Sequence, residues 1–337
     1  MRQWVFILLS TAFLLSCQTT PKCGPEVRAA FDVGSGSTKM KVVEFNTCTQ
    51  DVTQTVLEDQ VKVDYREALE KNAAGEFPES VQTEGLAALE KLKGEAQSKG
   101  AKKFTGIATA AFRQAKNAES FVKAIGEKLA IPLKVISQSE EAFLGFQAAR
   151  GKVKVSSADL VVWDIGGGSM QMTSVDDTLK PTVYYGNLAS VSFKNQVIAK
   201  IQKKNPDKVT SPNPLKKKNV KPSVALAEAE ASATVPANIK KKFANPEIVV
   251  VGIGGVLAKS LPRQMIAGSA MTQETIQAAL EIRSNMTDAQ INDQYAATEV
   301  TNLALVFGFM KALGMKSYQP ADVSLVDALW SDPLVWQ

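Results

Sequence analysis

The sequence predicts an α/β protein built from two mixed halves, and two observations carry this prediction. The chain has 337 residues, enough for two domains, and its apolar share of 45% is ordinary for a globular protein. Two glycine-rich turns, within 31–42 and 161–173, each join two apolar, strand-like runs. After each of these hairpins the sequence alternates between helical and strand patterns. No sequence repeat proves a duplication, but the same hairpin pattern opens both halves.

The hairpin at 161–173, which reads VVWDIGGGSMQMT, is the centre of the functional prediction. Gly166, Gly167 and Gly168 leave the turn without side chains, so its backbone N–H groups can approach a ligand and form an anion-binding nest. Asp164, at the mouth of the turn, is suited to holding a hard cation against a phosphate. The alternative is a tight hairpin in which glycine serves geometry alone. The related stretch at 31–42 favours the phosphate site.

Hydrophobic periodicity predicts the other elements of the chain. Strands are expected at 27–46 (a hairpin), 51–65, 103–109, 133–137, 159–175 (a hairpin), 182–185 and 247–251, and helices at 80–99, 111–129, 139–150, 193–202, 224–233, 272–283, 288–294, 300–313 and from 322 onward.

The stretch 203–222 carries seven lysines, one acidic residue and four prolines. This composition predicts a loop or a mobile segment. Two roles stay open for it: a solvated connector, or an electropositive lip that collects a polyanion.

The first residues predict export. Arg2 and an apolar run over 5–15, too short to span a bilayer as a stable helix, are typical of a secretory signal. The end of this run, Leu14-Leu15-Ser16-Cys17, resembles the lipobox of a bacterial lipoprotein. By that resemblance 1–16 is a signal peptide, Cys17 carries the lipid, and 17–26 is a tether. Gln18 favours an outer-membrane anchor on the periplasmic side, if the cell has two membranes. An ordinary signal peptide with a chance cysteine is the alternative.

Cysteine and histidine usage restricts the chemistry. Cys23 and Cys48 lie at equal distances from the centre of the first hairpin, so in an exported protein they are expected to form a disulfide at its open end; two free thiols are the alternative. The chain has no histidine. Acid–base chemistry must therefore come from carboxylates, and any metal site should be rich in oxygen ligands.

Four ordered motifs identify a family resemblance. They are Asp32-Val33-Gly34-Ser35-Gly36-Ser37-Thr38, Ala108-Thr109-Ala110-Ala111-Phe112-Arg113, Ile136-Ser137-Gln138-Ser139-Glu140-Glu141-Ala142 and Asp164-Ile165-Gly166-Gly167-Gly168-Ser169, followed by a late turn, Gly252-Ile253-Gly254-Gly255. Together they resemble the exopolyphosphatase/guanosine pentaphosphate phosphohydrolase (Ppx/GppA) family of the actin–hexokinase superfamily, over nearly all of the chain from residue 27 to about 329.

The resemblance implies two ribonuclease H-like (actin-like ATPase) domains around a central cleft. Domain I is expected at 27–139, with a C-terminal helix at 322–337 packed back on it, and domain II at 140–321. Mg²⁺ or another divalent cation would be the cofactor, polyphosphate or another phosphoanhydride the ligand, and a homodimer a further expectation. No nucleic-acid partner is expected.

The implied site residues fall into three groups. Glu141, Arg113 and Gln171 are the catalytic candidates, with Glu141 as the base that activates water; Asp32 and Asp164 are the metal ligands; and the phosphate-binding residues are Gly34, Ser35, Gly36, Ser37, Thr38, Gly166, Gly167, Gly168, Ser169, Gly252, Gly254 and Gly255. Physically, carboxylates can accept protons, glycine turns can donate backbone N–H groups, and a guanidinium suits a phosphate oxygen.

Two departures from the family pattern keep two functions open. The family usually has glutamate where this chain has Gln171, and asparagine where it has Gly36. Glutamine can orient water but cannot accept its proton. The first hypothesis is an exported exopolyphosphatase-like hydrolase that removes terminal phosphate with Mg²⁺, from polyphosphate or a guanosine pentaphosphate-type compound. The second is a catalytically weakened protein that binds and senses polyphosphate or a nucleotide.

Overall fold

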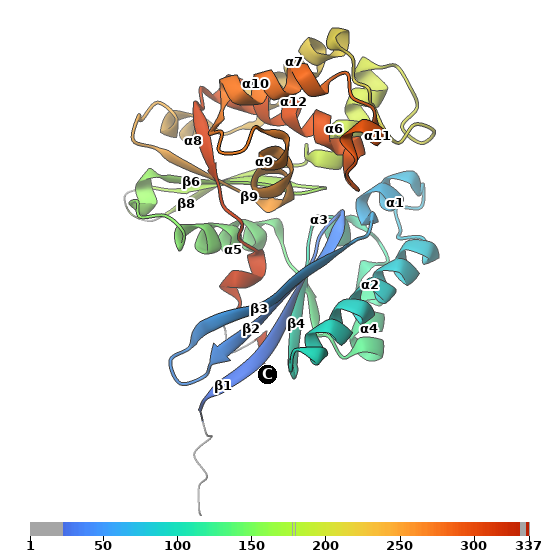
Figure 1. Ribbon diagram of the computed structural model, residues 1–337, viewed down its shortest axis with the longest axis vertical. Helices are drawn as coiled ribbons and strands as arrows, with labels where there is room; N and C mark the ends of the chain where they lie inside the picture. The colour runs from blue at the N-terminus through green and yellow to red at the C-terminus, as the bar shows by residue number, and fades with distance from the viewer. Residues whose placement is uncertain (1–22, 177, 179, 331–334, 337) are drawn as a thin grey trace, which may run out of the picture.

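Two mixed β-sheets organise the chain, and each carries helices of its own (Figure 1). The structure is a computed structural model that describes residues 23–176, 178, 180–330 and 335–336. It has the mixed α/β class that the sequence predicts.

The first sheet has the strand order β3-β2-β1-β4-β5. Strands β1 and β2 form an antiparallel hairpin, β3 adds antiparallel to β2, and β4 and β5 continue parallel to β1. Helices α2 and α4 cover one face. The elements are β1 (Pro25–Val33), β2 (Ser37–Asn46), β3 (Asp51–Lys62), α1 (Tyr65–Lys71), α2 (Glu79–Ser98), β4 (Lys103–Ala108), α3 (Ala110–Gln114), α4 (Ala118–Leu129) and β5 (Leu133–Val135).

The second sheet has the order β10-β11-β9-β6-β7-β8. Its strands are β6 (Leu160–Ile165), β7 (Met170–Val175), β8 (Pro181–Gly186), β9 (Val249–Ile253), β10 (Met271–Thr272) and β11 (Ser317–Pro320). The run β8-β7-β6-β9-β11 repeats the pattern of the first sheet, because an antiparallel glycine hairpin is again extended by strands parallel to its first arm. The recurring hairpin in the sequence therefore corresponds to a repeated topology.

Helices cover both faces of the second sheet. Alternation along β6 sends Val161, Trp163 and Ile165 toward a core shared with α12, whereas Val162 and Asp164 face the side on which α5 packs. The helical elements are α5 (Gln138–Arg150), η1 (Ser157–Asp159), α6 (Ser190–Gln196), its π-helical continuation η2 (Val197–Ile201), α7 (Lys217–Thr234), α8 (Ala237–Lys242), η3 (Gly255–Ser260), α9 (Leu261–Gln264), α10 (Gln273–Arg283), α11 (Asp288–Ile291), α12 (Ala296–Leu313) and η4 (Leu325–Ala328).

Helix α12 is the central helix of the second half. Among the described residues it is the one helix long and apolar enough to cross a membrane by length and composition, and 78% of that window is buried inside the protein. It packs against α7, α10 and α6. A helix that is apolar all round is expected in such a fully enclosed position.

Several predicted elements differ in extent from the structure, and two of the differences have a visible cause. The helix expected at 111–129 is divided into α3 and α4, because the Asn117 side chain bonds the backbone N–H and C=O of Phe77 at 2.8 and 2.9 Å. The lysine-rich loop expected at 203–222 ends earlier, since α7 begins at Lys217 and contains Pro222. Burial of Ala227 and Ala231 of α7 in the core outweighs the local cost of the proline.

The C-terminal segment packs on the first sheet, but not as the long helix expected at 322–337. Among the described residues of this segment, the helical part is η4, a single 3₁₀ turn. The face of the first sheet opposite α2 and α4 is covered by a cluster made of Ala30, Val43, Phe45, Ile107, Ile136, Leu325, Val326, Leu329, Trp330 and Trp336.

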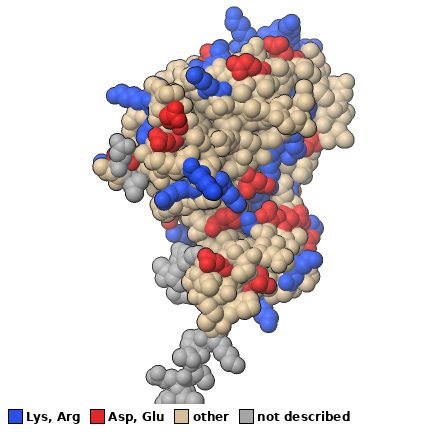
Figure 2. All heavy atoms as spheres, turned by 60° about the vertical axis from the view of Figure 1, so that its left-hand side comes forward, with Lys and Arg blue, Asp and Glu red and all other residues tan. Residues whose placement is uncertain are grey.

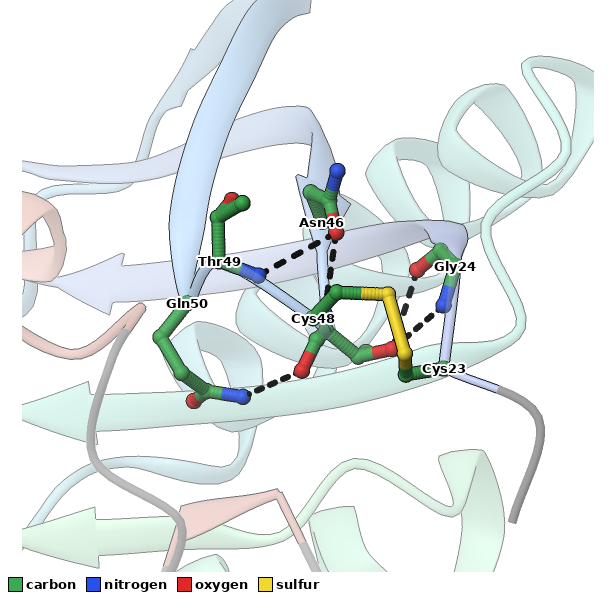
Figure 3. The surroundings of a disulfide bond; sticks show 7 residues. Cys23, Gly24, Asn46, Cys48, Thr49 and Gln50 are labelled. Atoms are coloured by element: carbon green, nitrogen blue, oxygen red, sulfur yellow. Dashed lines mark hydrogen bonds between the residues drawn. A yellow bond between two sulfur atoms is a disulfide. The ribbon is translucent and has the colours of Figure 1, made fainter. Parts of the chain in front are cut away.

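A disulfide between Cys23 and Cys48 closes the open end of the β1–β2 hairpin (Figure 3). Beside it, the Thr47 N–H donates to the Gly24 carbonyl at 3.0 Å. These contacts extend the pairing to the start of the described chain, so Pro25 and Glu26, expected in the tether at 17–26, belong to β1. The signal peptide at 1–16 and Cys17 lie outside the described residues.

Candidate active site

The two glycine turns contact each other where the two halves meet. Each turn is closed by one backbone bond, from Gly34 to Ser37 at 2.9 Å and from Gly166 to Ser169 at 3.0 Å. A Cβ added at Gly168 would lie 2.5 Å from Ser35 Oγ. Because no side chain fits there, the glycines let the two turns approach within contact distance.

A cleft of about 460 Å³ opens beside these turns. Figure 2 shows basic and acidic side chains close together where the upper and lower halves meet. The predicted site residues that line the cleft are Asp32, Gly34, Ser35, Gly36, Ser37, Glu141, Asp164, Gly166, Gly167, Gly168, Ser169, Gly254 and Gly255. Segments far apart in the sequence therefore converge on one cavity.

Glu141 is buried at the N-terminal end of α5. Its carboxylate oxygen Oε2 lies 2.7 Å from Arg113 Nη1, and Ser169 Oγ donates to Oε1 at 3.4 Å. Burial raises the pKa of Glu141 above its usual value, and the charge of Arg113 opposes this rise. The carboxylate is thus held beside the second glycine turn.

The neighbouring Glu140 has a different role. Its side chain accepts a bond from the Ser137 N–H at 2.8 Å and pairs with Lys134 at 2.7 Å. The Lys134 bond and the Ser137 cap lower its pKa to about 2. Capping of α5 therefore accounts for Glu140.

Asp32 and Asp164 lie at the ends of β1 and β6, one beside each turn. Burial, followed by the charges of Glu141 and Asp32, raises the pKa of Asp164 to about 7. Lys39, which was missed as a site residue, lines the same cleft, and its Nζ lies 3.5 Å from Asp32 Oδ2. Asp32 and Lys39 are partners across the β1–β2 register. Because the two residues flank the first turn at matching distances, the hairpin pattern in the sequence could have indicated that Lys39 lies beside Asp32.

The two aspartates provide a donor set that fits Mg²⁺ in part. This ion is commonly bound through one or two carboxylates together with substrate phosphates. Within the described chain no group of three or more Asp, Glu, Cys or His side chains could hold a metal by itself. A phosphate ligand would therefore have to complete the coordination shell.

Four predicted site residues lie behind the cleft wall rather than in it. Arg113 reaches the site through Glu141 and also donates to the Ile136 carbonyl at 3.0 Å. Thr38 is buried and 3.4 Å from the Tyr65 hydroxyl. Gly252 has a packing role, since a Cβ there would lie 2.5 Å from the Tyr318 ring. Gln171 is 1% exposed, beside Asp164 in the β6–β7 register, and both of its side-chain polar atoms are without a hydrogen-bond partner.

Gly254 lies in the late turn at 252–255, here called the third turn, and contacts Asp164. Its backbone has φ +79°, and a Cβ there would lie 2.2 Å from Asp164 Oδ1. Gly254 therefore permits both a left-handed backbone and the close approach of a buried carboxylate.

The raised pKa of Asp164 predicts a pH-dependent stability. The folded protein binds the Asp164 proton more tightly than the unfolded chain, for which 3.8 is the reference pKa, so stability falls as pH rises from about 4 to 7. We expect Asp164→Asn to have a free energy of unfolding about 1–3 kcal/mol above wild type at pH 8, with no such gain at pH 4. Urea titrations at both pH values measure this, and an equal difference at both would contradict the assignment.

Comparison with known families places this geometry in context. A model of the Ppx/GppA phosphatase family matches residues 42–291, more than half of the chain. The chain belongs to the Ppx/GppA phosphatase family. The matched range includes Arg113, Glu141 and the second glycine turn, and it begins after the first turn.

Solved Ppx/GppA structures share the fold. The Aquifex aeolicus family member is 17% identical, with a TM-score of 0.67, and the match covers 92% of this chain and 98% of that one. An exopolyphosphatase from Cytophaga hutchinsonii is 15% identical, with a TM-score of 0.68 and coverages of 90% and 96%. The likeness to these two proteins thus extends over both halves of the chain.

A bifunctional 3-dehydroquinate synthase/phosphatase of Fusobacterium nucleatum is 26% identical over 152 residues, or 44% of this chain. The chain spans 23% of the length of that relative.

Proposed function

We propose that this Ppx/GppA protein is a phosphoanhydride hydrolase that removes terminal phosphate from inorganic polyphosphate. The observation that carries the proposal is the meeting of two glycine-rich turns beside three carboxylates, those of Asp32, Glu141 and Asp164, in one cleft. Backbone N–H groups from two sides suit a chain of phosphates, and the carboxylates suit water activation. The exopolyphosphatase named among the solved relatives supports the same reaction class.

In the proposed reaction, Glu141 accepts a proton from the attacking water. The water oxygen forms a bond to the terminal phosphorus, the bridging P–O bond breaks, and its electrons stay on the shortened chain. Arg113 holds Glu141 in position from behind, and Ser169 does so from the second turn. Mg²⁺ held by Asp32 and Asp164 would supply neutralisation of phosphate charge.

A binding protein is the second candidate, and the position of Gln171 favours it. The side chain is buried beside Asp164 and cannot accept a proton. In this case the cleft would bind a phosphate chain and sense it without turnover.

Phosphate release distinguishes the two functions. We expect mature protein with Mg²⁺ to release phosphate from long-chain polyphosphate, and Gln171→Glu to raise the rate if the missing carboxylate limits it. Binding without release would support the sensor. If the protein neither binds polyphosphate nor releases phosphate from it, both candidate functions are refuted.

We also propose that the protein is exported and anchored to the cell envelope through a lipid at Cys17. The lipobox-like segment supports this, as does the disulfide, since disulfides persist in oxidising compartments. Cys17→Ser should move the protein from the membrane fraction to the soluble fraction. An unchanged membrane fraction would argue against the anchor.

A further inference from the structure

Helices α1 and α6 meet across one rim of the cleft, on the right-hand side of Figure 1. The Nζ of Lys194, on α6, lies 2.6 Å from Oε2 of Glu67, on α1, and both residues line the cleft. Beside this pair, the side-chain amide of Asn195 donates to the Glu70 carboxylate. Two side chains of the second half therefore hold two carboxylates of the first half.

Each of these helices is also bonded to the glycine turn of its own half. The Arg66 N–H of α1 donates to the Ser35 carbonyl of the first turn at 2.9 Å. The Val191 N–H of α6 donates to the Gly167 carbonyl of the second turn at 2.9 Å. A continuous series of contacts thus runs from one turn, through α1 and α6, to the other turn.

The two carboxylates each have a further partner on α1 itself. Lys71 Nζ lies 3.1 Å from Glu67 Oε1, and Arg66 Nε lies 2.6 Å from Glu70 Oε1. The side chain of Lys194 is 4% exposed, so its charge lies out of water beside Glu67. Because an uncompensated buried charge is costly, the buried position of Lys194 depends on Glu67.

We propose that Glu67 and Lys194, assisted by Glu70 and Asn195, form a clasp that positions the two glycine turns against each other, so that both turns bind one phosphate chain. The inference rests on the proposed function for its ligand. Glu67 and Lys194 act as positioning residues. Loss of either partner leaves the other charge uncompensated, the halves separate to hydrate it, and the two turns no longer meet.

The clasp and simple electrostatics predict opposite results for Glu67. Removal of a negative charge from the cleft wall would by itself favour an anionic ligand. If the clasp positions the turns, the same removal weakens binding, because Lys194 then loses its counter-ion and the rim opens.

The first test measures binding of inorganic tripolyphosphate with Mg²⁺ by calorimetry. We expect Glu67→Gln and Lys194→Met each to bind about tenfold more weakly than wild type, and the double variant to bind no more weakly than either single variant. Lys71→Met is the matched control, because Lys71 also lines the cleft and pairs with Glu67, but from the same helix. Its affinity should stay within about twofold of wild type. Unchanged or tighter binding by Glu67→Gln would overturn the proposal.

The second test measures the separation of the two halves by double electron–electron resonance and needs no ligand. Spin labels are attached at Lys123→Cys of α4 and Ile282→Cys of α10, two exposed positions, in protein that carries Cys17→Ser and keeps its disulfide. We expect one narrow distance distribution in this parent protein and a longer or broader one after Lys194→Met. The same distribution in both would overturn the clasp. If the distances change as expected but wild type binds no tripolyphosphate, the clasp is supported and the proposed function is refuted.

Discussion

Glu141→Gln is expected to reduce phosphate release from polyphosphate by about 10²–10⁴-fold while leaving binding of the chain largely intact. Glutamine keeps the shape of the side chain and its contact with Ser169, but it cannot accept the proton of the attacking water. The loss should appear in kcat rather than in KM, because the affected step follows substrate binding. Initial rates of phosphate release over a range of polyphosphate concentrations measure both constants.

The adjacent residue provides a matched control. Glu140→Gln changes the same charge on the same helix, yet Glu140 points to Lys134 and Ser137 instead of the cleft. We expect its kcat to stay within about twofold of wild type and its free energy of unfolding to change by less than about 1 kcal/mol. Equal losses of activity in both variants would mean that general negative charge, and not Glu141, supports the reaction.

Gly254→Ala is expected to destabilise the fold by about 2–4 kcal/mol and to weaken tripolyphosphate binding. The new Cβ would lie 2.2 Å from Asp164 Oδ1 and 2.9 Å from the Ile165 carbonyl oxygen, and the backbone has φ +79°. Either the third turn or Asp164 has to move, and both border the cleft. Urea unfolding monitored by tryptophan fluorescence measures the stability.

Gly255→Ala tests whether this effect is specific to the site. An added Cβ at Gly255 meets nothing within 4 Å, and its φ is not in the left-handed region. Its free energy of unfolding should stay within about 0.5 kcal/mol of wild type. A similar loss of stability in the two variants would show that the turn tolerates no alanine, whatever the space available.

Sequence reasoning located most of the cleft because glycine turns and strand ends are local features. Nearby residues determine the hairpins at 31–42 and 161–173 and the strand register of Asp32 and Asp164 within them. They also determine the position of Glu141 at the start of α5. The class of the fold, its two sheets and its family were predictable for the same reason.

Contacts between distant segments were not predictable. Arg113 was expected to contact phosphate directly, but its guanidinium lies against Glu141, a pairing set by the way α3 and α5 pack. Gln171 follows a glycine turn in the sequence, yet strand alternation directs it beneath α5, where it is buried. Pro222 suggested a loop, while packing of α7 on α12 maintains a helix there.

The disulfide at the open end of the β1–β2 hairpin has a mechanical consequence. A pull on the chain before Cys23 would, without it, peel β1 away from β2 one residue pair at a time. The covalent bond between Cys23 and Cys48 transmits such a load into both arms of the hairpin together. Because β1 and β2 are then pulled together, the load is resisted in shear by the ladders that join β1 to β4 and β2 to β3.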